Sequence, residues 1–103
     1  LNPDDRQAHH DLAQSFEHLK RWKEGVFHYR EVLRIGQTSE DMDVWVYEVH
    51  QDAARCLELA GEYHEAAEEL KCYLAALKEL QADEETINNV KKKIQALENK
   101  DHH

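Results

Sequence analysis

Histidine, cysteine and carboxylate side chains, which bind metals or act as acids and bases, are frequent in this chain. It has eight histidines and two cysteines among 103 residues. His9 and His10 are adjacent and therefore point to different faces of a helix. No HExxH motif or compact cluster with metal-ligand spacing is present. We therefore predict structural histidines, no metal site and no cofactor, with adventitious nickel or zinc binding as the alternative.

No sequence motif for nucleophilic or acid–base catalysis is recognisable either. Cys56 and Cys72 form no CxxC motif, so we expect buried, reduced thiols that pack as small apolar residues, with a disulfide as the alternative. No Ser-His-Asp or Cys-His arrangement is legible. The carboxylates of Glu65, Glu68 and Glu69 lie on a face that the pattern predicts to be solvated. Acid–base catalysis needs a cleft and a shifted pKa, so we predict no catalytic residue and no enzyme activity.

Two segments that share one pattern must position these side chains. Residues 11–33 and 52–74 match each other at an offset of 41 residues, and such internal repeats are the signature of repeat architectures. Apolar residues recur three and four positions apart in both segments, as they do on one face of a helix. Each segment therefore predicts two amphipathic helices joined by a tight turn.

Small and large residues alternate at equivalent positions of the two segments. They are Ala13, Phe16, Trp22, Gly25 and Tyr29 in the first segment, and Ala54, Leu57, Tyr63, Ala66 and Leu70 in the second. This alternation resembles the tetratricopeptide repeat, most closely in the run GEYHEAAEEL at 61–70. The resemblance implies an all-α domain whose antiparallel helical hairpins stack as a short right-handed solenoid. It also implies a protein–protein interaction or scaffold function.

Three features depart from the family pattern. The period is 41 residues, whereas about 34 is usual. Lys20 replaces the turn glycine, which the second copy keeps as Gly61. The proline that usually ends a repeat is absent, and Gly36 is predicted to stop the second helix instead. An unrelated helical bundle with coincidental spacing is the alternative.

We predict one domain of five helices over residues 1–101. Its parts are a first repeat at about 4–36, a second at about 40–80 and a capping helix at about 84–99. A third helix that starts early, near Glu40, accounts for the long period. The β-branched run at 44–49 leaves a strand as the alternative there. Because the chain begins at Leu1, we expect an excised piece of a longer protein, and we treat 102–103 as a purification-tag remnant.

The formal net charge of −9 restricts the partners. It opposes binding to nucleic acids and to anionic membrane surfaces, which attract clustered lysine and arginine. No run approaches the roughly 20 apolar residues that span a bilayer, so we predict no membrane insertion. We expect a cytoplasmic protein because no secretory signal is visible. The acidity is attributed to solubility, with an acidic docking face or a salty habitat as alternatives.

The family resemblance implies a concave groove, lined by the first helix of each repeat, that accepts a peptide or a helix of another protein. By position, the groove residues are Gln7, His10, Gln14, Glu17, His18, Glu48, Gln51, Asp52, Arg55 and Glu58. Some family members grip chaperone tails with a lysine and asparagine clamp, but only Arg55 is basic here, so we predict no such binding. A basic or amide-rich partner segment is expected, and a solvated face on a structural spacer is the alternative.

The expected start of the third helix carries more apolar residues than one short neighbouring helix covers. Trp45, Val46 and Val49 are therefore a candidate self-interface, and a homodimer is one predicted assembly, with packing of this segment against the capping helix as the alternative. The alternative to an interaction module is a non-catalytic accessory or oligomerisation domain of a larger enzyme or regulator.

Overall fold

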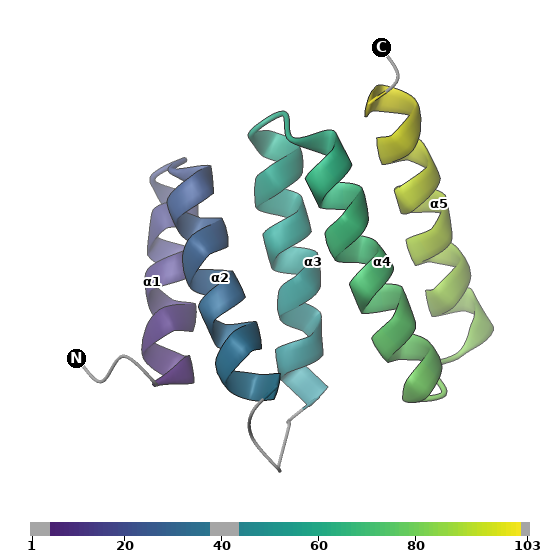
Figure 1. Ribbon diagram of the computed structural model, residues 1–103, viewed down its shortest axis with the longest axis horizontal. Helices are drawn as coiled ribbons and strands as arrows, with labels where there is room; N and C mark the ends of the chain where they lie inside the picture. The colour runs from purple at the N-terminus through teal and green to yellow at the C-terminus, as the bar shows by residue number, and fades with distance from the viewer. Residues whose placement is uncertain (1–4, 38–43, 102–103) are drawn as a thin grey trace.

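Five helices make up the part of the chain that the computed structural model describes, residues 5–37 and 44–101, with side chains described for 5–36 and 48–101. They are α1 (Arg6–His18), α2 (Trp22–Gln37), α3 (Val44–Leu59), α4 (Tyr63–Glu79) and α5 (Glu84–Asp101). No strand occurs among these residues, so the all-α prediction is confirmed and the strand alternative for 44–49 is wrong. Successive helices run antiparallel, and each packs against the next along the chain (Figure 1).

Small residues lie where the helices approach most closely, as the repeat pattern predicts. Ala13, Gly25, Ala54 and Ala66 are all buried. A Cβ atom added to Gly25 would lie 3.4 Å from the backbone oxygen of Ala13, so α1 and α2 are already in near contact at this point. Of the large residues of the pattern, Tyr29, Leu57 and Leu70 are also buried. The other three, Phe16, Trp22 and Tyr63, are half-buried.

The turn that ends each of α1, α3 and α4 has the same backbone geometry. Its central residue has a positive φ, of 60° at Lys20, 82° at Gly61 and 58° at Gln81. The amide of the following residue donates to the carbonyl five positions back, as Arg21 does to Phe16 at 2.9 Å. This pair of features is a Schellman motif, which pairs helix-end carbonyls that would otherwise lack partners. Lys20 therefore adopts a left-handed backbone conformation that usually favours glycine.

The ends of the other elements follow from capping and packing. The Asp5 carboxylate accepts from the backbone amides of Gln7 and Ala8 at 3.0 and 3.3 Å, which caps α1. The prediction that Gly36 stops α2 is wrong, because Gly36 is buried inside a helix that continues to Gln37. α5 buries Val90, Ile94 and Leu97 and covers α4. None of the five described helices is long and apolar enough to cross a bilayer.

Candidate partner-binding groove

Two neighbouring hollows follow the side of the molecule formed by α1, α3 and α5, and they meet at Arg55. One, of about 360 Å³, is lined by Gln14, Glu17, His18, Lys20, Trp22 and Arg55. The other, of about 350 Å³, is lined by Gln51, Arg55, Leu70, Thr86, Asn89, Val90 and Lys93. We call these two hollows together the groove. Five of the predicted groove residues therefore lie in it: Gln14, Glu17, His18, Gln51 and Arg55.

Arg55 ties the first hairpin to the second at the centre of the groove. Its Nε and Nη2 donate to the two carboxylate oxygens of Glu17, at 2.6 and 2.8 Å. Its Nη1 lies 3.0 Å from Asp52 Oδ1, one helical turn away. The Tyr29 hydroxyl donates to Glu17 at 2.8 Å. A bidentate arginine–carboxylate pair of this kind fixes geometry as well as charge.

These contacts hold Glu17, Arg55 and Tyr29 each in one protonation state. The Arg55 hydrogen bond keeps the pKa of Glu17 below its usual range, so Glu17 stays ionised. The same bond raises the pKa of Arg55. Burial, followed by the hydrogen bond to Glu17, raises the pKa of the Tyr29 phenol well above its ordinary value. None of these three groups titrates near neutral pH, so they form a structural tie and not an acid–base pair.

The other predicted groove residues line neither hollow. Gln7 is exposed and donates to Asp11 on its own helix at 3.1 Å. His10 packs edge-on against the ring of Tyr29, with 5.9 Å between ring centroids. Glu48 is exposed and Glu58 is half-buried. Asp52 forms an ion pair with Arg55, which lies on the same helix.

One residue of the candidate self-interface, Val49, is buried in the structure. This side chain is 1% exposed and belongs to the core, so it cannot contact a second chain and its assignment to a self-interface is wrong. Helix α3 is already underway at Val44, and the face that carries Val49 packs inward. The side chains of Trp45 and Val46 lie outside the described residues, so the self-interface stays a prediction for them.

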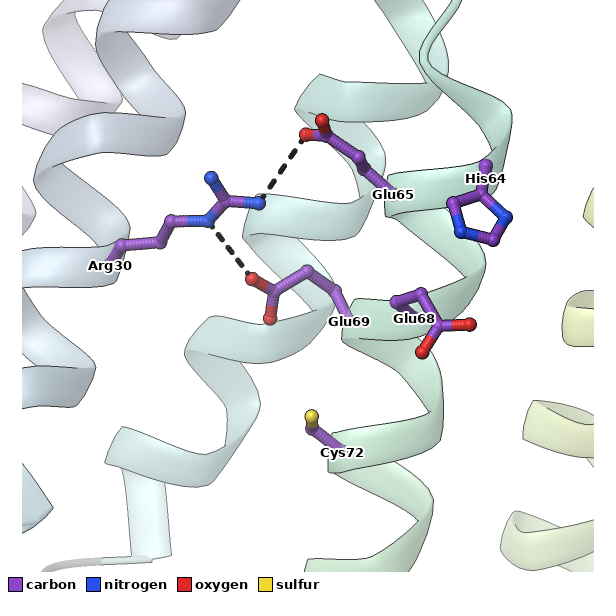
Figure 2. A pocket seen from close by; sticks show the side chains of 6 residues that line it. All are labelled: Arg30, His64, Glu65, Glu68, Glu69 and Cys72. Atoms are coloured by element: carbon purple, nitrogen blue, oxygen red, sulfur yellow. Dashed lines mark hydrogen bonds and ion pairs between the residues drawn. The ribbon is translucent and has the colours of Figure 1, made fainter.

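The opposite side of the molecule, between α2 and α4, carries a second charged cluster (Figure 2). Arg30 reaches from α2 to Glu69 at 3.1 Å and to Glu65 at 3.5 Å, both on α4. Glu69 also lies 2.9 Å from His50 Nδ1. Figure 2 shows Cys72 beside this cluster and His64 pointing away from Arg30. Since Arg30 and Glu69 satisfy each other, the cluster joins the two hairpins as the Arg55 pair does on the groove side.

The described histidines and cysteines lie in different surroundings. His9 pairs with His28, and His50 with Glu69, and no group of three potential ligands that could hold a metal ion occurs there. Both cysteines are free thiols. Cys56 is buried, and burial raises the pKa of its thiol to about 12. Cys72 is exposed, so the expectation of two buried thiols is wrong for this residue.

The sequence analysis did not predict that α5 lines the groove. Thr86, Asn89 and Lys93 of α5 line it over a floor of Leu70 and Val90. These three residues recur three and four positions apart beside the apolar seam that contains Val90, and that spacing is the signal that could have revealed them. α5 is therefore part of the candidate site as well as a cap.

Comparison with family models, curated proteins and solved structures finds no match to this chain. The resemblance to tetratricopeptide repeats therefore rests on the residues of the two repeated segments and stays a prediction.

Proposed function

We propose that this chain is a protein–protein interaction module, without a catalytic role, that binds an extended, amide-rich peptide segment of another protein in the groove. The observation that carries the proposal is that the two hollows lie next to each other across α1, α3 and α5, with Arg55 lining both. The tetratricopeptide resemblance supports the same location, because that family uses the side formed by the first helices of its repeats.

The chemistry of the lining favours a neutral, hydrogen-bonding occupant. Gln14, Gln51 and Asn89 are exposed amides in the groove, and an amide side chain both donates and accepts. An extended peptide offers one donor and one acceptor per residue and needs such partners. Arg55 offsets the charge of Glu17, which lines the groove, and part of the charge of Asp52 beside it, and Lys20 and Lys93 also line the groove. The groove therefore offers less attraction to a basic segment than its sequence suggests.

Selection of a random-peptide library on the immobilised chain, followed by fluorescence anisotropy, tests the proposal. We expect amide-rich sequences to be enriched. The double variant Gln51→Ala/Asn89→Ala should bind the selected peptide about tenfold more weakly, because each lost hydrogen bond contributes roughly 0.5–1.5 kcal/mol. The matched control is Asn88→Ala/Gln95→Ala, which removes two exposed amides of α5 that do not line the groove. Equal binding by the groove variant, or no enrichment at all, would overturn the proposal.

A further inference from the structure

Exposed apolar side chains mark one end of the molecule. Leu19 is 66% exposed and Leu59 is 54% exposed, and they lie at the α1–α2 and α3–α4 turns, which Figure 1 shows at the same end. A hollow between the turns is lined by Arg21, Trp22, Lys23, Glu24, Leu59 and Ala60. We call Leu19, Lys20, Arg21, Trp22, Lys23 and Leu59 the turn-end surface.

The turn-end surface is basic on an acidic protein. Lys20, Arg21 and Lys23 are exposed there, whereas the whole chain carries a formal charge of −9. Arg21 is paired with Glu24 at 2.6 Å. Lys20 and Lys23 have no ion pair with any carboxylate of the described residues, although Glu62 borders a neighbouring hollow together with Lys23. Two lysines without carboxylate partners therefore flank Trp22 and the exposed leucines.

The backbone conformation at position 20 does not require a lysine. Lys20 has a φ of 60°, and the equivalent residue of the second turn is Gly61 with a φ of 82°. The left-handed conformation is unfavourable for residues with a Cβ atom and costs glycine little. A positive φ alone does not mark a binding site, since Gln81 also has one, of 58°. Because Lys20 also lines the end of the groove next to Trp22, its side chain is placed where a bound segment would meet it.

We propose that the turn-end surface binds an acidic segment of a partner protein, which inserts one apolar side chain between Trp22 and Leu59. Carboxylates of the segment pair with Lys20 and Lys23, and the inserted side chain removes the exposed leucine from water. This partner differs in chemistry from the neutral occupant of the groove, although the two sites share Lys20 and Trp22. Leu59 lies outside the groove, and Gln51 and Asn89 lie outside the turn-end surface, so their variants test the two proposals separately. A short acidic segment meets only the local lysines. An extended anionic membrane surface also meets the rest of the acidic chain within a Debye length of about 8 Å.

The test uses the full chain, labelled with ¹⁵N, and a fluorescein-labelled synthetic peptide in which aspartate and glutamate flank one central leucine. We expect backbone amide shifts to change at residues 19–24 and 59–60. Leu59→Ser should weaken binding about tenfold. Lys20→Gly should weaken it about threefold, as expected for one exposed charge pair, while raising the melting temperature by relieving the turn.

Matched controls lie at the α4–α5 turn, which Figure 1 shows at the other end of the molecule. Gln81→Gly relieves the same positive φ, and Leu80→Ser removes a leucine that is also exposed; both variants should leave peptide binding unchanged. Three results would overturn the proposal. The first is shift changes elsewhere or none at all. The second is equal binding of a peptide whose leucine is replaced by serine. The third is binding to phosphatidylserine vesicles in place of the peptide.

Discussion

The first hairpin, α1 with α2, and the second, α3 with α4, make one equivalent contact with different chemistry. His9 Nδ1 lies 3.0 Å from His28 Nδ1 in the first hairpin. His50 Nδ1 lies 2.9 Å from Glu69 Oε2 in the second. Both pairs span 19 residues, and they occupy the same positions of the repeated pattern. The repeat therefore specifies where two side chains meet and leaves their charge free to vary.

The difference changes how each hairpin responds to protons. Burial and the neighbouring His9 lower the pKa of His28, so the first hairpin favours the neutral form of the His28 imidazole. Burial raises the pKa of Glu69, but His50 and Arg30 together bring it below its usual value. The ionised form of Glu69 is therefore favoured in the second hairpin, whereas the protonated form of His28 is disfavoured in the first.

The largest expected effect comes from the equivalent core residues Tyr29 and Leu70, which are 0% and 2% exposed. Tyr29→Ala should lower the free energy of unfolding by about 3–5 kcal/mol and Leu70→Ala by about 2–5 kcal/mol, because each leaves a cavity. Urea denaturation of the chain measures both. A cost below about 1 kcal/mol for either variant would show that its hairpin does not share the common core.

A second variant of Tyr29 separates its packing from its hydrogen bond. Tyr29→Phe keeps the ring and removes only the hydroxyl that donates to Glu17 at 2.8 Å. We expect a loss of about 1 kcal/mol, because Arg55 still satisfies the carboxylate. Leu70 has no polar atom, so the comparison assigns the remainder of the Tyr29→Ala effect to volume.

The turns of the two hairpins should respond to substitution in opposite directions. Lys20→Gly should stabilise the chain by about 1 kcal/mol and Gly61→Ala should destabilise it by a similar amount, because both residues have a positive φ that disfavours a Cβ atom. A Cβ atom at Gly61 would meet no heavy atom within 4 Å, so the cost would come from the backbone alone. Thermal unfolding measures both, and a stabilising Gly61→Ala would contradict this reasoning.

A smaller effect is expected at the small-residue positions of α2 and α4. Gly25→Ala places a methyl group at 3.4 Å from the Ala13 oxygen and 3.8 Å from Cys56 Sγ, both ordinary contacts. Helix propensity favours alanine over glycine by roughly 0.5–1 kcal/mol, so this variant should be stabilising. Ala66→Gly, at the equivalent position of the second hairpin, should be destabilising by at least that amount. Calorimetry on both variants checks the pair, and a destabilising Gly25→Ala would mean that α1 and α2 lie too close for a methyl group.

How well the sequence predicts a contact depends on how far apart its two residues lie along the chain. Burial of Ala13, Gly25, Ala54 and Ala66 was predictable, because it depends on helical periodicity within one hairpin. The pair of Glu17 with Arg55 was not, because the two residues are 38 positions apart and meet only after the hairpins have packed. The helical pattern alone also did not show which face of α5 completes the groove.

Two local errors have similar causes. Val49 looked like surplus apolar surface, yet it is buried in the core. Cys72 was expected to be buried, but its side chain is exposed on the α2–α4 side. Partial burial, followed by the neighbouring Glu69 and Glu68, raises the pKa of its thiol. In both cases the rotation of one helix against its neighbours decided burial, and composition did not reveal that rotation.

The smallest expected effect is the pH dependence of the first hairpin. Because the folded chain lowers the pKa of His28 below the unfolded value of 6.5, the unfolded state binds a proton first as pH falls. The stability contributed by the neutral His28 imidazole is therefore present above pH 6.5 and is lost as pH drops through the lower folded pKa. Glu24 and Glu31 oppose this shift, while His9 adds to it, and the rings of Phe16 and Phe27 provide the remaining contacts.

His28→Gln tests this dependence, because glutamine can still hydrogen-bond His9 but does not titrate. We expect the unfolding free energy of the unmodified chain to fall between pH 7 and pH 5.5, and the fall to be smaller in His28→Gln. His64→Gln, which removes a largely exposed histidine, is the matched control and should keep the full dependence. The Glu69 carboxylate should contribute to pH dependence only below the ordinary glutamate value of 4.5, where its stabilising charge is lost as pH falls through its lower folded pKa. If His64→Gln flattened the profile as much as His28→Gln, the acid sensitivity would belong to histidines in general and not to the first hairpin.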